Sequence, residues 1–430
     1  MCDASYTDVC KNNLLYSDCD ENYKTTILTP DKYDQCADRA QEDGASDTTL
    51  GIKAHCVFNE LSSFHCVDQL APCLGHDFFE GTFAYDVQFY VNYIINKEKL
   101  LSIDEFNEKI RYVKLSSRDA KNRPKLFKNR PGKYEGNAGS LRILSRILTT
   151  ILSGILELSA TENYLIKLHE LSEIITAPKL TVDEVNVVME EIIVQYLDMR
   201  TEAMVTLEMP RARPKHHFLS HYPRAYRNSG PLIAIWALRM ESKHCYFKSV
   251  IRTSKNFKNV ALTCANRHQL AQVSYAFYGL FSKSKNDIPD NAPLARHLGL
   301  RTADQHLKTF FINLDSNAVI PKKIKIFGTE YENGKVLVIK KLDHGKLKVG
   351  LIKAVSYARG EVTFAVTTFE ALQSKIGSYV STKSLSLHEV VKYELLADYY
   401  PLQMLGTLDS FSFILHHYVS ECGGELVANV

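Results

Sequence analysis

The chain has 430 residues, of which 45% are hydrophobic and 23% are charged, and its formal net charge at pH 7 is +3. This length predicts two or three domains with at least one sizeable core, which excludes a disordered chain, a collagen-like chain and a disulfide-stapled mini-domain. No apolar run reaches the roughly 18 residues of a bilayer span and the first residues lack an apolar signal stretch, so we expect no contact with a membrane.

Charge is distributed unevenly along the chain. Residues 1–80 contain 15 Asp and Glu but only 5 Lys and Arg, a local net charge of −10. Residues 209–286 contain 14 Lys and Arg and a single carboxylate, Glu241. A basic stretch interleaved with aromatic residues is typical of a surface that binds nucleic-acid phosphates. It is also compatible with a solvated face, or with a patch that docks on the chain's own acidic N-terminal region.

Cysteines are concentrated near the N-terminus. No pair there has the Cys-x-x-Cys spacing that signals a zinc site. Cys66 and Cys73 could share a metal with His65 or His76, but we expect thiols, because the absence of a secretory signal indicates a reducing compartment. Seven of the ten cysteines lie in the first 73 residues: Cys2, Cys10, Cys19, Cys36, Cys56, Cys66 and Cys73.

Two helices and a loop open the predicted helical region. Residues 85–113 predict two helices, with Ser102 as the N-cap of the second. Residues 121–139 are rich in Pro, Gly, Lys and Arg, which predicts a loop that could serve as a mobile basic arm.

Three further helices are expected after this loop. Apolar residues recur at helical spacing over 140–157, 162–176 and 182–207, and Thr181 is placed to cap the last of these. Residues 85–207 are therefore expected to form one all-helical domain.

The pattern changes after about residue 313, where apolar and polar residues alternate with a period of two. Turn signals follow at 332–335, 343–346 and 359–361. Short alternating strands joined by such turns predict a small antiparallel barrel or sandwich at the C-terminus.

The basic segment contains the residues best suited to metal binding or catalysis. His216, His217 and His221 lie within six residues, a spacing that suits two zinc ligands on one turn, although two histidines make only half of a tetrahedral site. The helix after Gly230 has apolar residues on every side, so we expect it to be buried together with Glu241. A buried carboxylate needs a cation, either an Arg or Lys partner or a divalent metal at a phosphoryl-transfer site. The candidate DNA contacts are Arg211, Arg213, Lys215, Arg224, Arg227, Arg239, Lys243, Lys248, Arg252 and Lys255.

Four stretches carry a resemblance to a known family. The segments KHHFLSHYPR (215–224) and GPLIAIWALRMESKHCYFKSVIRTSKNFKNVALTCANRHQLA (230–271) resemble the C-terminal part of CACTA/EnSpm-like transposases of animal genomes. The segments 51–87, which contains GHDFFEG, and 395–419 resemble the same proteins. A related arrangement, a histidine pair followed about twenty residues later by a catalytic glutamate, occurs in the recombination-activating recombinase.

The resemblance implies a ribonuclease H-like fold interrupted by a large helical insertion, to which residues 85–207 would correspond. It implies that His216 and His221 are two ligands of a zinc site and that Glu241 is the last of three carboxylates holding two Mg²⁺ ions for DNA strand transfer. In the family, both aspartates and the Cys-x-x-Cys that completes the zinc site precede the region matched here. Within GHDFFEG we expect His76, Asp77 and Glu80 to have a structural or DNA-contacting role rather than to replace the aspartates.

Three functions remain under consideration. The leading interpretation is a transposase-derived nuclear protein, or a cytoplasmic non-functional remnant, that binds DNA without strand-transfer chemistry. Another is a fragment of an active, Mg²⁺-dependent transposase. A third is a protein-interaction module that uses the C-terminal β domain. No small-molecule cofactor is expected, and a partial core would expose apolar surface and favour homo-oligomers.

The expected architecture is α+β in four parts. Residues 1–84 form an acidic, Cys-rich entry segment, and residues 85–207 form the helical insertion. Residues 208–310 form the end of a ribonuclease H-like core, and residues 311–430 form the small β-rich domain.

Overall fold

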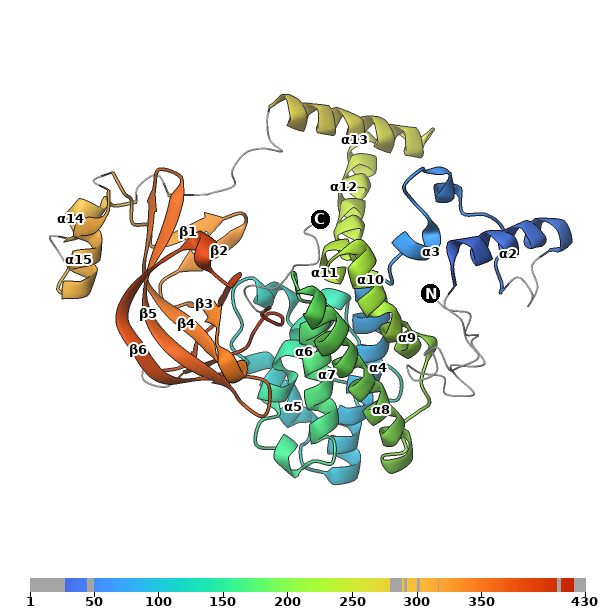
Figure 1. Ribbon diagram of the computed structural model, residues 1–430, viewed down its shortest axis with the longest axis horizontal. Helices are drawn as coiled ribbons and strands as arrows, with labels where there is room; N and C mark the ends of the chain where they lie inside the picture. Colours follow the sequence, from blue (N-terminus) through green and yellow to red (C-terminus); the bar gives the residue numbers. More distant parts are fainter. Residues whose placement is uncertain are drawn as a thin grey trace. The chain divides into compact units, whose positions relative to one another are not determined.

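The computed structural model of the protein describes residues 28–44, 50–278, 288–289, 292–299, 302–315, 317–407 and 411–420. The part of the chain that the structure describes is 52% helical and 16% strand, a mixture of helix and sheet as expected for an α+β protein. It divides into two compact units, described separately below (Figure 1). The helical unit comprises Met1–Trp236, Gln373–Tyr379 and Ile414–Val430, and the second unit comprises Ala237–Leu372 and Val380–Phe413. The division between Trp236 and Ala237 falls inside the segment 208–310.

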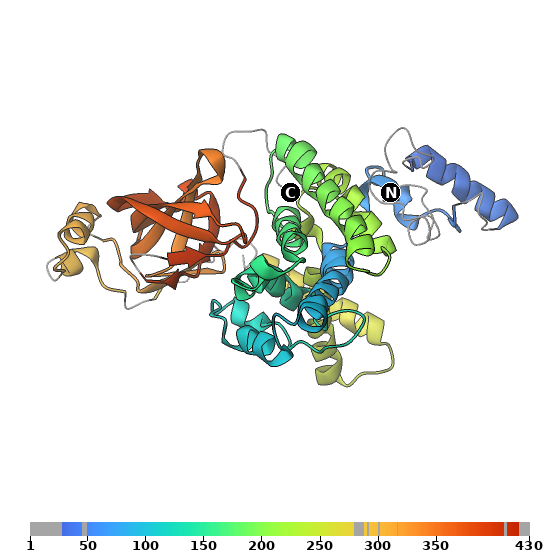
Figure 2. The same cartoon turned by 90° about the horizontal axis from the view of Figure 1, so that it is seen from below.

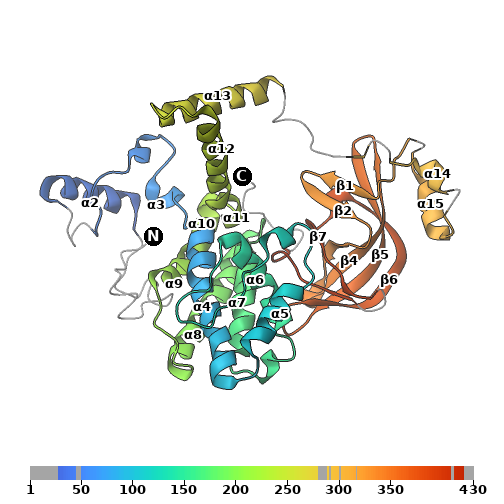
Figure 3. The ribbon, with the colours of Figure 1, turned by 180° about the vertical axis from the view of Figure 1, so that it is seen from behind.

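The helical unit contains the helices expected between residues 85 and 207. Helices α6, α7 and α8 pack side by side, as Figures 1 and 3 show. Three segments, η4, η5 and η8, are π-helical, a conformation that is rare and often found at functional sites. The elements are α2 (Pro30–Asp43), η3 (Val57–Glu60), α3 (Cys66–Gln69), η4 (Gly75–Phe83), α4 (Ala84–Asn92), η5 (Tyr93–Glu98), α5 (Ile103–Tyr112), η6 (Asp119–Asn122), α6 (Ala138–Ile151), η7 (Leu156–Leu158), α7 (Glu162–Ile175), η8 (Glu184–Met189), α8 (Glu190–Thr206), α9 (Pro214–Phe218), η9 (Leu219–His221), α10 (Tyr222–Ser229) and α11 (Leu232–Ile235).

Both helix starts expected from capping residues are confirmed. The Ser102 hydroxyl accepts a hydrogen bond from the backbone N–H of Glu105, whose carboxylate accepts one from the backbone N–H of Ser102. Thr181 and Glu184 form the same reciprocal pair, at 3.1 and 2.9 Å, at the start of η8. Each pair satisfies two backbone donors that would otherwise lack partners in the first turn.

The segment 121–139 is a loop apart from its first two residues, which end η6, and its last two, which begin α6, but it is anchored at several points. Gln88 and Asn92 of α4 donate hydrogen bonds to its backbone carbonyls at 3.1 and 3.0 Å. Asn107 of α5 exchanges two hydrogen bonds with the backbone of Phe127, and the Phe127 side chain is buried. The expectation of a mobile arm is therefore wrong, because side chains of two helices hold its backbone in place.

The second unit combines helices with a curled antiparallel sheet. Its sheet has seven strands in the order β7-β3-β4-β5-β6-β9-β8, and β1 and β2 form a separate hairpin. The sheet curls into a half-barrel, so the expected small β domain is confirmed in outline (Figures 1 and 2). The elements are α12 (Leu238–Ser254), α13 (Val260–Phe277), α14 (Ala295–Gly299), α15 (Gln305–Asn313), β1 (Lys323–Ile326), β2 (Thr329–Glu332), β3 (Val336–Lys341), η10 (Asp343–Gly345), β4 (Leu347–Ala358), β5 (Glu361–Gln373), β6 (Tyr379–Lys392), η11 (Tyr393–Leu395), β7 (Asp398–Leu402), β8 (Leu405–Gly406) and β9 (Phe411–Phe413).

A two-residue turn sets the register between β4 and β5. Ala358 pairs with Glu361, so the chain reverses through the two residues Arg359 and Gly360, both at positive φ. A two-residue turn with this backbone matches the right-handed twist of paired strands.

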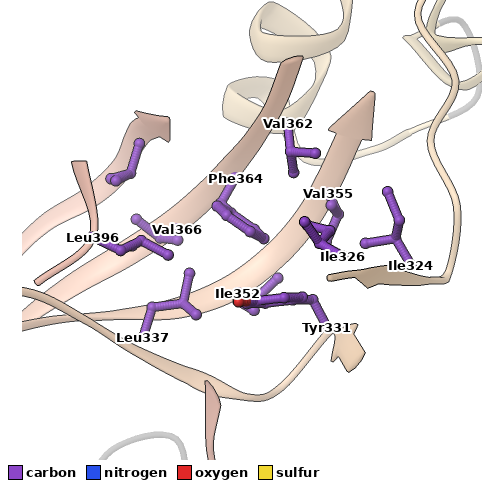
Figure 4. Packing of buried hydrophobic residues seen from close by; sticks show 11 residues of the cluster. Ile324, Ile326, Tyr331, Leu337, Ile352, Val355, Val362, Phe364, Val366 and Leu396 are labelled. Carbon is purple, nitrogen blue, oxygen red and sulfur yellow. The ribbon is translucent and has the colours of Figure 1, made fainter. Parts of the chain in front are cut away.

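One core fills the concave side of the strands. Ile324 and Tyr331 from the β1–β2 hairpin point toward Ile352, Phe364 and other apolar residues of the sheet (Figure 4). A second cluster packs Phe310 and Phe311 of α15 with small residues of β4 and β5. The first cluster takes alternate residues of β5 (Val362, Phe364 and Val366), as the period of two predicts, and the second takes Ala365 between them.

Within the described part of residues 208–310, every regular element is a helix. The ribonuclease H-like core implied by the resemblance therefore stays a prediction. No described helix combines the length and hydropathy of a membrane span.

Candidate functional site

A buried ion-pair network lies at the junction of α4, α8 and α9. The Asp86 carboxylate of α4 is 1% exposed and lies 3.3 Å from Nε of Arg200 on α8. His216 Nε2 of α9 lies 3.2 Å from the same carboxylate, and the Tyr196 hydroxyl donates a hydrogen bond to it. Three helices are thus joined through a single carboxylate.

The network lowers the pKa of its carboxylate and orients the ring of His216. Burial alone would raise the pKa of Asp86, but the positive charge of Arg200, aided by His216 and Tyr196, holds the pKa below its ordinary value. The backbone N–H of Arg213 donates to His216 Nδ1 at 3.0 Å. In the neutral imidazole the proton is therefore on Nε2, where it is donated to Asp86.

Arg200 keeps one donor unsatisfied. Its Nη2 donates to the carbonyl of Pro210 at 2.6 Å, whereas Nη1 is buried and has no hydrogen-bond acceptor among the described residues. An unpaired buried donor costs about 1–3 kcal/mol, so an acceptor that reached Nη1 would be bound favourably.

The three histidines do not share one environment. Both ring nitrogens of His216 are engaged inside the network, which does not suit the zinc ligand implied by the resemblance. The rings that lie together are those of His217 and His221, with centroids 5.0 Å apart. Within the part of the chain that the structure describes, no three His, Cys, Asp or Glu side chains converge on a metal-sized site. Zinc at this turn stays a prediction.

The GHDFFEG motif forms the π-helix η4 and contacts α9. The Lys215 ammonium donates to the carbonyl of His76 at 2.7 Å and lies 3.8 Å from the Asp77 carboxylate. Burial raises the pKa of Asp77, and Lys215 partly opposes that rise. A Cβ at Gly81 would lie 2.5 Å from the Lys215 side chain, so only glycine lets this lysine cross η4.

Glu80 has a capping role. Its carboxylate accepts a hydrogen bond at 2.8 Å from the backbone N–H of Ala138, the first residue of α6. A carboxylate there also interacts favourably with the helix dipole. His76, Asp77 and Glu80 thus all make structural contacts.

Three candidate DNA contacts of the helical unit are engaged within it. Lys215 is bound to η4 as described, and Arg224 forms a 2.7 Å ion pair with Asp68. Arg227 lies 3.1 Å from Glu190. The ion pair between Arg224 and Asp68 joins the basic stretch 209–286 to the acidic region 1–80, a contact of the kind that the charge pattern left open as an alternative. Arg211 and Arg213 are exposed.

The Glu241 helix differs from expectation in its burial. Glu241 and most of α12 are exposed, so the expectation that this helix and its carboxylate are buried is wrong. Apolar residues on all sides of α12 face solvent or α13 rather than a surrounding core: the Tyr246 hydroxyl donates to the carbonyl of Arg267 at 3.1 Å, and the rings of Phe247 and His268 lie 5.8 Å apart.

Exposed cations line one face of α12. Lys248 and Arg252 are one turn apart and Glu241 precedes Lys248 by seven residues, so these three share one face, and Lys255 follows as the C-cap residue of α12 with a left-handed backbone. We call the three cations Lys248, Arg252 and Lys255 the α12 stripe. Helical spacing places the stripe away from the side of Tyr246 and Phe247 that contacts α13. Lys243 is exposed on another side, and the side chain of Arg239 lies outside what the structure describes.

Helix α13 presents an apolar face. Leu270, Val273 and Phe277 are 67%, 64% and 82% exposed, and their spacing of three and four residues places them on one side. Its described residues include one charged side chain, Arg267.

The six described cysteines carry thiols rather than disulfides, and Cys36 and Cys66 are buried. Cys2, Cys10 and Cys19 lie outside the described residues. The Cys73 sulfur lies 3.1 Å from His76 Nδ1, which joins two residues singled out in the sequence.

Sequence reasoning missed the centre of the buried network. Asp86, Tyr196 and Arg200 were not candidates, although a charged residue within an apolar helix is a signal that a buried partner exists.

No protein family, curated protein or solved structure matches the chain.

Proposed function

We propose that the chain is a transposase-derived DNA-binding protein of the nucleus that does not perform strand transfer. The observation that carries this proposal is the α12 stripe, three exposed cations on the last two turns and the C-cap of α12, within a segment that has one carboxylate. Cations at this spacing can follow the phosphates of one strand without reading base edges. Binding is therefore expected to be sensitive to salt and tolerant of sequence.

The absence of strand transfer rests on carboxylate number. Two-metal catalysis needs ions roughly 4 Å apart, held by several carboxylates. Among the α12 residues on the stripe's face, Glu241 supplies one such ligand. The chain's contribution to DNA binding is then electrostatic, and Mg²⁺ is required only if the chain is a fragment of an active transposase.

A fluorescence-anisotropy titration of a labelled duplex against the full chain tests this proposal. We expect the logarithm of the association constant to fall linearly with the logarithm of salt concentration. The variant K248Q/R252Q/K255Q should bind more weakly and lower the steepness of that line by about 2.7, since each lost phosphate contact contributes about 0.9.

The matched control removes the same number of charges from the β domain. Lys322, Lys325 and Lys340 are exposed there, and the variant K322Q/K325Q/K340Q should bind as the unmodified chain does. Binding that is indifferent to salt, or equal losses in both triple variants, would refute a role for the α12 stripe.

One observation favours the alternative of an active fragment. Glu241 is exposed on the same face as the stripe, so a metal bound there would lie beside DNA held by the cations. Mg²⁺-dependent nicking of the duplex that Glu241→Gln abolishes would establish this alternative. Nicking unchanged by that substitution would indicate a contaminating nuclease.

We also propose that a second copy of the chain covers α13. Leu270, Val273 and Phe277 form an exposed apolar stripe on a helix with one charge, so two such helices can pair without burying unpaired charges. Light scattering should give a dimer whose dissociation constant rises at least about tenfold in Val273→Lys. A monomeric unmodified chain at high concentration would refute the pairing.

A further inference from the structure

The buried network forms one wall of a pocket in the helical unit. The pocket has a volume of about 180 Å³ and is enclosed by α4, α8, the tip of the loop at Pro131 and Gly132, and the segment that joins α8 to α9. Asp86 and Arg200 line it, Phe89 and Met209 supply apolar wall, and Arg211 and Arg213 lie at its rim. It is separate in sequence and in unit from the α12 stripe.

The lining charges favour an anion. Three arginines face a single carboxylate among the described lining residues, and the low pKa of Asp86 keeps that carboxylate ionised and paired with Arg200. Arg213 at the rim therefore supplies positive charge that the carboxylate of the pocket does not neutralise.

One of these arginines is positioned in advance. The guanidinium carbon of Arg213 lies 3.8 Å from the centre of the Tyr85 ring, a cation–π contact that restricts the side chain. Its backbone N–H is also fixed on His216. An arginine already held at the rim loses less conformational freedom when it binds a ligand.

Arg200 supplies the second, independent sign of a ligand. It is 3% exposed, it lines the pocket, and its Nη1 has no acceptor within the described residues. A ligand oxygen that enters the pocket, with a small adjustment of the side chain, would give this donor the acceptor it lacks.

We infer that the pocket binds a phosphate monoester, either a free nucleotide or the terminal phosphate of a DNA strand. A monoester carries a charge between −1.5 and −2 near neutral pH, which suits a lining of three arginines and one carboxylate, and guanidinium forks bind phosphate oxygens in pairs. Phe89 and Met209 give the pocket an apolar wall against which the group that the phosphate carries can pack. This inference does not depend on DNA binding by α12.

Calorimetric titration of the full chain tests the inference, with AMP as the probe and adenosine as its uncharged counterpart. We expect AMP to bind and adenosine not to bind, and Arg213→Gln to weaken AMP binding at least about tenfold through the loss of a charge-assisted hydrogen bond. Arg111→Gln is the matched control, because Arg111 is exposed in the same unit but does not line the pocket.

The two phosphate sources are separated with oligonucleotides in the K248Q/R252Q/K255Q background. Tighter binding of a 5′-phosphorylated strand than of its 5′-hydroxyl counterpart identifies a strand end, and binding of AMP without that difference identifies a free nucleotide. Equal heats from AMP and adenosine, or equal effects of Arg213→Gln and Arg111→Gln, would overturn the inference. Loss of salt-sensitive duplex binding with AMP binding retained would refute the proposed function alone.

Discussion

Replacing Asp86 by Asn should strongly destabilise the helical unit. The substitution keeps the shape of the side chain but removes the charge that Arg200, 3% exposed, depends on. It also weakens the hydrogen bonds that the carboxylate receives from Tyr196 and His216. Leaving one partner of a buried pair uncompensated costs about 3–5 kcal/mol, and we expect Asp86→Asn to lower the free energy of unfolding by this amount.

A second substitution separates this cause from a general disturbance of packing. Replacing both partners of a buried pair by neutral side chains is often close to neutral, because no buried charge remains. The double variant D86N/R200M loses the hydrogen bond from Arg200 to Pro210, worth about 1 kcal/mol, but should still be more stable than Asp86→Asn alone.

The chain offers a selective probe for this measurement. Trp236 is its only tryptophan and belongs to the helical unit, where its ring lies 6.4 Å from that of Phe79. Tryptophan fluorescence during urea unfolding therefore follows this unit without assuming that both units unfold together. A loss below about 1 kcal/mol in Asp86→Asn, or a double variant less stable than the single one, would refute the reasoning.

Three further predictions use the same fluorescence assay. Gly81→Ala should lower the free energy of unfolding of the helical unit by about 1–3 kcal/mol, because the new Cβ overlaps the Lys215 side chain. Adding Lys215→Ala should restore most of this loss. If stability is not restored, the overlap with Lys215 is not the cause. Ser102→Ala should cost about 1 kcal/mol by removing the cap of α5, and a variant as stable as the parent would show that the cap is dispensable. Burial raises the pKa of Glu173, although the charges of His169, His417 and Arg146 oppose the rise. The protonated carboxyl is therefore favoured in the folded state. The stability that this proton contributes is complete below the unfolded pKa of about 4.3 and is lost as the pH rises through the folded-state pKa. Glu173→Gln should therefore flatten the fall in stability between pH 4 and 7, and parallel pH profiles of the two proteins would contradict this sign.

Local signals predicted much of the fold. The caps at Ser102 and Thr181 involve residues three apart, and the turn at Arg359 and Gly360 is set by two residues, so each can be read from a short window. Burial of the Glu241 helix could not be read in this way. Its apolar residues predict burial only if other elements surround it, and that depends on the tertiary structure.

The candidate site was less predictable for the same reason. His216, His217 and His221 look equivalent in sequence, yet His216 contacts a carboxylate 130 residues earlier in the chain, while the rings of His217 and His221 lie together. The basic residues divide similarly: Arg224 is neutralised by Asp68 across 156 residues, while Lys248 and its neighbours on α12 remain exposed. Composition counts every one of these charges as available to a polyanion.

This division decides where a phosphate can bind. An exposed, unrestrained lysine on α12 gains Coulomb energy and counterion release but must lose side-chain freedom, so its contribution depends on salt. Arg213 is held on Tyr85, and Arg200 is held by Asp86 and Pro210, so both have lost that freedom before any ligand arrives. Binding in the pocket should accordingly be less sensitive to salt than binding to the α12 stripe. Titrations of AMP and of duplex DNA at the same two salt concentrations would measure the difference, and equal salt dependence would show that the pocket arginines act only as surface charge.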